Sequence, residues 1–369
     1  MEFLEHIVRH PPAGPVLMAV AFRPARAAPR IAGLAAAAGP RGHEVVVGPL
    51  SAAEVREFLG PGVSRSRSAA LYEASGGNPF YLEALARMDG ADVTELPPTV
   101  LAALRVELGH LSPGALLVAQ AAAVPADEFD PAVAARVPPE ATLAALDELV
   151  GRDILRDVSG RFRFRHPLVR RAVYESAAAG WRLGAHARIA AHLAEVGAPA
   201  TVRAHHVERS SSYGDRRAVE VLVAAARAVT AHAPATSAHW LRAALRLMPD
   251  DATTREDRLA LMMELSWAQG ISGRLAEGRD TARELLRMLP EDDYPRRGRA
   301  ARVAALMERQ LDRPYEARAL LLDELSRMPD PLAAAAVPMR MRLVAESMMR
   351  VDFRAAQAVL DLMPDSADD

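Results

Sequence analysis

A recurring phrase in the C-terminal third of the chain constrains its fold more than any other feature. Four stretches rich in alanine, leucine and arginine each end in a proline, at Pro249, Pro290, Pro329 and Pro364, and these prolines stand 41, 39 and 35 residues apart. A unit of this length has room for two helices, in which small alanines allow close approach, leucines fill the seam and the proline stops the second helix. The sequence therefore predicts stacked helix pairs over residues 236–369, preceded by a helical linker and the start of the array over residues 177–235.

The spacing is close to the roughly 34-residue tetratricopeptide period, with slightly longer loops. Half of the residues are apolar but only 5% are aromatic, so the apolar residues are largely alanine, leucine and valine, a helix-favouring mixture. We expect a mostly α fold with a tetratricopeptide-like α-solenoid. The acidic residues 365–369 follow the fourth unit almost at once, where a solenoid normally carries a polar capping helix.

The first 60 residues show a different pattern. Two short apolar runs, Val16–Phe22 and Glu44–Val47, are bounded by proline or glycine and flank an alanine-rich stretch at residues 31–38. This order predicts two buried parallel strands joined by a crossover helix, as at the end of a doubly wound α/β sheet. Two strands cannot form a stable sheet alone, so residues 1–60 are interpreted as the C-terminal remnant of an α/β domain whose first half is missing.

Residues 51–176 read as helices followed by a hairpin. A capping box at Ser51 and Glu54 opens a helix to about Leu59, and further helices are expected at 68–74, 79–88, 97–108, 112–124 and 142–149. Residues 154–158 and 161–165 then form a hairpin across Ser159-Gly160. Helices followed by a small β-wing are typical of a winged helix, which we place at 112–176, after a helical domain at 61–111.

Two missing residue types exclude whole classes of chemistry. All 45 basic residues are arginine, so the chain has neither a Schiff-base lysine nor a phosphate loop of the G-x-x-x-x-G-K-[ST] type. It also has no cysteine, which excludes disulfides, thiol nucleophiles and cysteine-ligated zinc. The net charge of −2 does not attract nucleic acid or anionic membrane. Without an 18-residue apolar run or a basic leader, the sequence predicts a cytoplasmic protein with no membrane association.

Two clusters suggest binding sites that the sequence itself disfavours. Arginines 161, 163, 165, 170 and 171 invite a DNA-binding interpretation, but alternation with phenylalanines 162 and 164 places the first three on the solvent face of a half-buried strand. Histidines 186, 192, 205 and 206 suggest zinc, but no two of them stand at i, i+4. We expect seam or surface histidines, no metal site and no direct DNA contact.

Three phrases carry a family resemblance. Residues 72–85 contain Gly-Gly-Asn-Pro-Phe-Tyr-Leu, residues 164–174 read Phe-Arg-His-Pro-Leu-Val-Arg-Arg-Ala-Val-Tyr, and residues 20–24 read Val-Ala-Phe-Arg-Pro. In this order they resemble the signal-transduction ATPases with numerous domains (STAND), especially the large ATP-binding LuxR-type transcriptional regulators of actinobacteria. The resemblance implies a nucleotide-binding domain, a helical lid, a winged helix and a repeat array. It also implies that the phosphate loop lies upstream of this chain and a DNA-binding helix-turn-helix downstream, so the chain resembles an internal fragment.

The resemblance also implies roles for four residues. Arg23 matches a sensor arginine that contacts the terminal phosphate, although a surface arginine after a strand is the alternative. Gly77 and Pro79 belong to a turn that packs against adenine in the family, or simply start a helix. His166 matches the winged-helix histidine that holds the β-phosphate of ADP, or else is a capping or core histidine. No catalytic or metal-binding residue is expected.

The implied function is regulatory. We expect a regulatory and protein-interaction segment of an ATP-dependent LuxR-type regulator, which is not itself an enzyme and alone binds neither ATP nor ADP tightly. A protein or small-molecule inducer on the repeat array and self-association are the expected partnerships. The alternatives are the ATPase-plus-repeat module of an adenylate cyclase or protein kinase, and a standalone scaffold that binds a protein or peptide.

Overall fold

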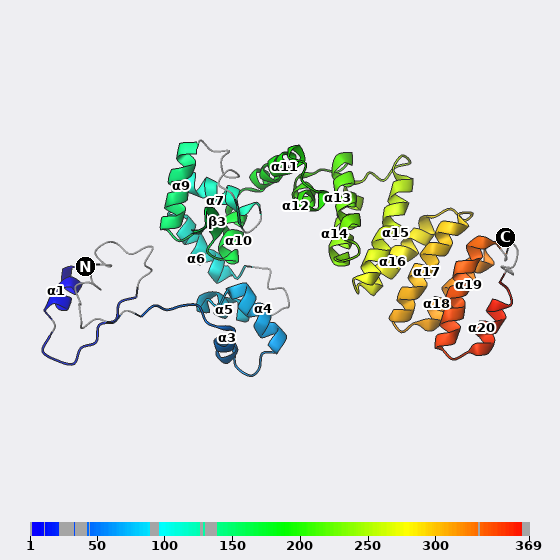
Figure 1. Cartoon of the computed structure of the whole chain (residues 1–369), viewed down its shortest axis with the longest axis horizontal. Coiled ribbons are helices and arrows are strands. Elements are labelled where there is room, and N and C mark those ends of the chain that lie inside the picture. The colour runs from blue at the N-terminus through cyan, green and yellow to red at the C-terminus, as the bar shows by residue number, and fades with distance from the viewer. Residues whose placement is uncertain are drawn as a thin grey trace. The chain divides into compact units, whose positions relative to one another are not determined.

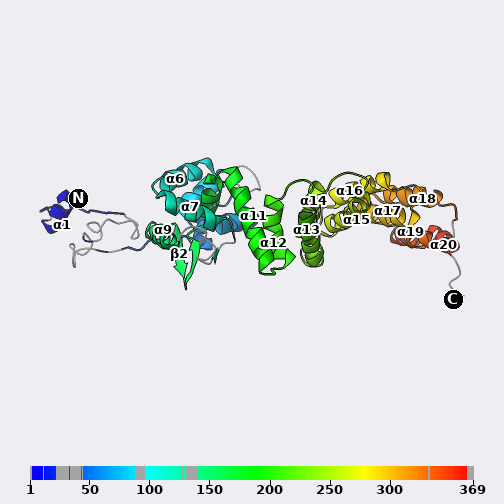
Figure 2. The same cartoon turned by 90° about the horizontal axis from the view of Figure 1, so that it is seen from above.

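Helices dominate the molecule (Figures 1 and 2). The computed structural model describes residues 2–10, 12–21, 33, 43, 45–88, 96–125, 128–129, 139–330 and 333–363. The chain divides into two compact units, Met1–Ala185 and His186–Asp369. The mostly α fold with a tetratricopeptide-like array is thus confirmed. No helix in the described ranges is both long and apolar enough to span a bilayer.

The first unit contains short helices and a small sheet. Its elements are α1 (Glu2–Arg9), α3 (Ala52–Leu59), α4 (Arg65–Ser75), α5 (Pro79–Ala86), α6 (Pro98–Leu108), α7 (Pro113–Ala123), β1 (Glu128–Phe129), α9 (Pro139–Gly151), β2 (Leu155–Val158), β3 (Arg161–Phe164) and α10 (Pro167–Ser176). α11 (Ala179–Glu195) crosses from this unit into the next. A single apolar core, from Val55 in α3 to Val173 in α10, joins the helices to the sheet.

Side-chain caps explain where these helices begin. Ser51 accepts a hydrogen bond from the Glu54 amide while the Glu54 carboxylate accepts from the Ser51 amide, which completes the predicted capping box of α3. Ser64 and Ser112 cap α4 and α7 through their hydroxyl oxygens. Each cap satisfies an amide that the helix leaves without a partner, so the helix starts are fixed locally.

The small sheet confirms the predicted hairpin and adds a strand. β2 pairs antiparallel with β3 across Ser159 and Gly160, whose φ values of 54° and 82° are both positive, as a two-residue hairpin turn of this twist requires. β1 pairs with the other edge of β3, giving the order β1-β3-β2. β1 is only two residues long, too short for an alternating pattern to reveal it in the sequence.

The two strands predicted near the N-terminus are not formed where the structure describes them. Residues 16–21 and 45–47 belong to no strand, and their side chains are exposed, Leu17 by 94% and Val46 by 87%. An apolar run becomes a buried strand only when neighbouring strands pair with its backbone, and the described residues of this region supply no such neighbour. The alanine-rich stretch expected as the crossover helix lies outside the described residues, except for Gly33.

The second unit is an array of helix pairs (Figure 1). Its helices are α12 (Ala200–Ser210), α13 (Arg216–Val229), α14 (Pro234–Leu247), α15 (Arg255–Ile271), α16 (Leu275–Met288), α17 (Tyr294–Gln310), α18 (Pro314–Ser326), the 3-10 turn η3 (Ala334–Ala336), α19 (Val337–Met349) and α20 (Phe353–Leu360). The four recurring phrases form α14, α16, α18 and α20, the second helix of each pair. Pro249, Pro290 and Pro329 follow three of them, while Pro364 lies outside the described residues.

The turn within each of the last three pairs reveals a sharper period than the prolines do. Gly273, Asp312 and Val351 adopt positive φ values of 83°, 61° and 59°, and they stand 39 residues apart. Each lies just after the first helix of its pair, in the left-handed conformation that commonly ends helices. Asparagine or glycine is usual in this conformation, so valine at position 351 shows that the array geometry overrides a local preference.

The first helices of these pairs line one side of the array. α17 contacts both α15 and α19, whereas the second helices α16, α18 and α20 make no comparable contact with one another in the described part of the chain. Because the first helices approach each other more closely, the array curves toward them. The exposed sides of α15, α17 and α19 therefore form its inner face.

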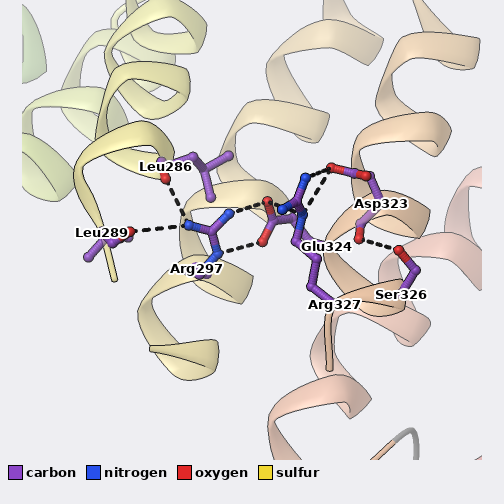
Figure 3. A network of polar contacts seen from close by, with 7 residues as sticks. All are labelled: Leu286, Leu289, Arg297, Asp323, Glu324, Ser326 and Arg327. Atoms are coloured by element: carbon purple, nitrogen blue, oxygen red, sulfur yellow. Dashed lines mark hydrogen bonds and ion pairs between the residues drawn. The ribbon is translucent and has the colours of Figure 1, made fainter. Parts of the chain in front are cut away.

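Buried ion pairs tie consecutive helices of the array together. The Arg297 guanidinium of α17 donates to both carboxylate oxygens of Glu324 in α18, at 2.8 and 2.6 Å, and to the backbone carbonyl oxygens of Leu286 and Leu289 (Figure 3). Both charged side chains are less than a tenth exposed. The same arginine thus joins α17 to α18 and to the C-terminal end of α16, where the carbonyls lack helical partners.

Candidate functional site: the junction of the glycine turn and His166

The turn between α4 and α5 is held in an unusual backbone conformation. Gly76 and Gly77 have φ values of 57° and 73°, which glycine adopts without steric cost. Asn78 then caps α5, its side-chain oxygen accepting from the amides of Phe80 and Tyr81. Pro79 is the first residue of the helix, where a missing amide hydrogen costs nothing. The start of α5 is therefore already capped by protein atoms.

Gly77 lies against the segment that leads into α3. Its carbonyl oxygen accepts a 2.8 Å hydrogen bond from the Leu50 amide, and a Cβ atom at position 77 would lie 2.2 Å from the Leu50 carbonyl oxygen. No other residue type fits without displacing one of these backbones. The need for glycine thus comes from a backbone contact as well as from the φ value.

His166 caps α10 with its own ring. The imidazole Nδ1 accepts a hydrogen bond from the Leu168 amide at 3.1 Å, so in the neutral ring the proton resides on Nε2. This confirms the capping role. The Leu168 amide at the start of α10 is thereby already engaged by the protein.

The other side of the His166 ring faces the glycine turn. The ring packs on Tyr81 with centroids 4.6 Å apart, and a Cβ atom at Gly76 would lie 3.1 Å from Nε2. Only 9% of the residue is exposed, and Nε2 is buried without a hydrogen-bond partner of good geometry among the described residues. His166 therefore joins the winged-helix region to the turn before α5, and its Nε2 proton lies near the Ser75 backbone without a hydrogen bond of good geometry.

Burial lowers the pKa of His166. The nearby backbone of Ser75 acts against this lowering, and the positive charges of Arg165 and Arg156 reinforce it. The ring is therefore neutral near pH 7, with a single polar hydrogen on Nε2. Such a group can donate one hydrogen bond to an acceptor oxygen.

The residue before His166 holds the same junction together and corrects an expectation. Arg165 was expected on the solvent face of the wing, but its side chain is 8% exposed and pairs with Glu107 of α6 through both carboxylate oxygens. It also donates to the Asp153 carbonyl oxygen at 2.8 Å. The strand alternation ends at Phe164, so the next side chain turns inward with the chain as it enters α10.

Two of the remaining arginines of the cluster are exposed, and the other two contact neighbouring protein groups. Arg161 and Arg163 are exposed, as the alternation predicts. Arg170 donates to the carbonyl oxygens of Ala123 and Pro125 at the end of α7, and Arg171 pairs with Glu175 one turn along α10. Arginines engaged in this way are less available to phosphates, although direct DNA contact as such stays untested.

The structure thus brings together three of the four predicted site residues. Gly77 and Pro79 lie in the turn that His166 contacts through Gly76 and Tyr81. Arg23 lies outside the described residues. Sequence reasoning missed Tyr81, although it belongs to the same phrase as Pro79 and its ring could have been expected to meet the second phrase.

The histidine cluster forms a hydrogen-bonded pair in the second unit. Nδ1 of His186 in α11 lies 2.9 Å from Nδ1 of His206 in α12, and both residues are buried. His192 is exposed. Within the described ranges no three His, Cys, Asp or Glu side chains gather as metal ligands would. The predicted seam position is confirmed for His186 and His206.

Comparison with solved structures gives a distant likeness. No protein-family model matches the chain, and no curated protein does. A STAND protein with a tetratricopeptide repeat sensor from Pyrococcus horikoshii is similar at 12% identity and a TM-score of 0.33, over 85% of this chain and 47% of that one. The chain thus spans about half the length of that structure.

Proposed function

We propose that the chain is a regulatory and protein-interaction segment of an ATP-dependent regulator of the STAND type. The three sequence phrases support this, and so does the contact between two of them at the junction of His166 with the glycine turn. The nucleotide changes the contact between the lid (α4–α6) and the winged helix, and the repeat array receives a partner. The chain itself supplies no phosphate loop, because it contains no lysine.

The buried Nε2 of His166, which has no hydrogen bond of good geometry among the described residues, is the observation that supports the proposal most. A buried donor with no acceptor at all costs about 1–3 kcal/mol, and a poorly formed hydrogen bond leaves part of that cost. An ADP phosphate oxygen that reached Nε2 would remove this cost, since the ring is already oriented by its Nδ1 hydrogen bond to α10. The buried contact with Gly76 and the phosphate contact are then alternatives, which makes His166 a two-position switch.

At the finer level we propose a LuxR-type transcriptional regulator, in which the array senses a protein or small-molecule inducer. The order of the three phrases and the helical array behind them support this assignment. An adenylate cyclase or protein kinase regulator would use the same junction, and the output domain distinguishes them. Genomic DNA on either side of the coding sequence is therefore the first observation to make: an in-frame helix-turn-helix supports the regulator.

The decisive experiment uses this chain joined to its phosphate-loop domain. His166→Asn keeps a side-chain cap for α10 but removes Nε2, whereas His166→Ala removes both. Loss of a hydrogen bond to a charged phosphate costs about 1.5–3 kcal/mol, so both variants should release ADP about tenfold faster or more. ADP dissociation at the wild-type rate in both variants would overturn the switch.

A further inference from the structure

Two arginines on the inner face of the array differ from the other arginines of the same helices, because they have no polar partner among the described residues. On α15, α17 and α19, every other arginine donates to, or pairs with, a carboxylate or carbonyl oxygen, as Arg258, Arg309 and Arg342 illustrate. Arg299 and Arg302 have no hydrogen bond or ion pair to any residue that the structure describes. Arg302 is half-buried, and its Nε is fully buried without a partner.

The register of the array shows what surrounds these two arginines. The ion pairs Arg227–Glu264 and Arg309–Glu346 each join side chains 37 residues apart on consecutive first helices. The same offset places Arg302 beside Leu265 of α15 and Met339 of α19, which are buried two residues before the exposed Trp267 and Met341. Arg299 lies one turn before Arg302 on the same side of α17.

Large apolar side chains lie exposed on both neighbouring helices. Trp267 and Ile271 on α15 are 44% and 45% exposed, and Met341 and Met348 on α19 are 50% and 49% exposed. We call Trp267, Ile271, Arg299, Arg302, Met341 and Met348 the inner-face patch. Tryptophan, methionine and arginine are the residue types enriched in protein interfaces.

Carboxylates of these helices do not neutralise the patch. Glu256, Glu264, Glu308 and Glu346 are each already paired with an arginine. Asp257 lies in the first turn of α15, where the helix amides favour a negative charge. Arg299, which is exposed, and Arg302, which is half-buried, therefore have no acidic partner among the described residues.

We propose that the inner-face patch binds an acidic peptide segment with interspersed apolar side chains. Glutamate or aspartate carboxylates of the partner would pair with Arg299 and Arg302, since the planar guanidinium matches a carboxylate with two parallel hydrogen bonds. Leucine or phenylalanine side chains of the partner would cover Trp267 and Met341. This proposal rests on the protein-interaction role proposed above and names the partner's chemistry.

Binding of short fluorescent peptides to the chain, followed by anisotropy, tests the proposal. The probe alternates glutamate with leucine and phenylalanine; one comparison peptide replaces glutamate with lysine, and another replaces the apolar residues with serine. The wild-type chain should bind the probe best, with an affinity that falls as salt rises. Equal binding of the glutamate and lysine peptides, or no binding of the probe, would overturn the proposal.

Charge-reversal variants locate the binding. Arg299→Glu with Arg302→Glu should weaken probe binding about tenfold or more, because two charge-assisted contacts become repulsive. Arg287→Glu with Arg354→Glu makes the same change of net charge on the second helices α16 and α20 and should leave binding within about twofold. An equal loss in both double variants would show a net-charge effect and contradict a site.

Two further variants distinguish a loss of binding from a loss of folded structure. Arg299→Gln with Arg302→Gln removes the charges without repulsion and should also lower affinity, with circular dichroism unchanged. Trp267→Ala should lower the affinity for the probe but leave the lower affinity for the serine peptide unchanged. Peptide binding is measured without nucleotide, so its outcome is independent of the ADP-release experiment on His166. The peptide proposal can therefore be wrong while the switch proposal is right, and the switch proposal can be wrong while the peptide proposal is right.

Discussion

Arg297 in the repeat array and His166 at the junction with the glycine turn are two buried polar side chains with different partners. Arg297 is buried with Glu324 and two backbone carbonyls, so its charge is paired and four hydrogen bonds hold its guanidinium (Figure 3). His166 is buried to a similar degree, yet its Nε2 has no partner of good geometry among the described residues. Arg297 thus fixes α17 against α16 and α18, whereas the junction leaves one donor poorly satisfied next to a glycine turn.

The difference between these two side chains indicates where a conformational change costs less free energy. A matched buried network stabilises one arrangement, because breaking it exposes uncompensated charge. An unsatisfied donor raises the free energy of the arrangement that buries it and so favours an alternative in which it is satisfied. The Arg297–Glu324 contact therefore holds one arrangement of α16, α17 and α18, and the junction at His166 is the candidate switch.

The largest expected effect tests how much the buried Arg297–Glu324 pair contributes to the stability of the second unit. Glu324→Ala leaves Arg297 buried without its carboxylate and should cost about 3–5 kcal/mol of unfolding free energy in the second unit. Arg297→Met with Glu324→Leu should recover part of this loss, because the buried charges are gone but two carbonyls lose a donor. Chemical denaturation measures both variants.

The exposed pair Arg87–Glu83 provides the control. Both side chains are more than half exposed, and Glu83→Ala should change stability by only about 0.3–0.5 kcal/mol. A similar small effect for Glu324→Ala would contradict the view that the array depends on matched buried charges.

The next effect tests the constraint at the turn. Gly77→Ala places a Cβ 2.2 Å from the Leu50 carbonyl oxygen and forces alanine to a φ of 73°, so it should cost about 2–3 kcal/mol in the first unit. Gly114→Ala, inside α7 with open space around its Cβ, should instead stabilise by about 0.5–1 kcal/mol. Amide hydrogen exchange resolves the two units, and a neutral Gly77→Ala would show that the turn relaxes freely.

A smaller effect separates the two roles of His166. His166→Ala loses the cap of α10 and should cost about 1–2 kcal/mol, whereas His166→Asn keeps a capping oxygen and should cost less. The thermal unfolding temperatures of the two variants measure this difference in stability. Equal losses would mean that packing on Tyr81, not capping, is what His166 contributes to stability.

The smallest expected effect is a pH dependence. The pKa of His166 is lowered in the folded chain, so the unfolded chain takes up the proton first as pH falls below about 6.5. The stability of the first unit is therefore complete above that pH and decreases as pH falls toward the folded pKa, by at most about 1.4 kcal/mol per pH unit. His166→Asn should lose this component, and an unchanged pH slope in the variant would contradict it.

Much of the fold could be predicted from the sequence because its signals are local. The capping box at Ser51, proline at the start of α5 and Ser159-Gly160 in the hairpin each specify a structure through neighbouring atoms. The repeated phrases likewise gave the second helix of each pair. The strands predicted at residues 16–22 and 44–47 were wrong where the structure describes them, because a strand depends on partners that the local pattern does not contain.

The candidate site was predictable only in part. The phrases containing Gly77, Pro79 and His166 identified the residues, but their contact through Gly76 and Tyr81 joins positions 90 and 85 residues apart. Arg165 was misassigned because strand alternation stops at Phe164. The unpaired Arg299 and Arg302 could not be recognised either, since pairing depends on which carboxylates the array brings close.

The most direct test of the central claim is the protonation of His166 in the chain itself. Nitrogen-15 NMR of the histidine rings, with His166 assigned by its absence in His166→Asn, reports which nitrogen carries the proton and at which pH the ring titrates. We expect a neutral ring with its proton on Nε2, no proton on Nδ1 and a pKa below the usual value of about 6.5. A proton on Nδ1, or titration at the usual pH, would contradict the claim that His166 caps α10 and keeps a poorly satisfied donor facing the glycine turn.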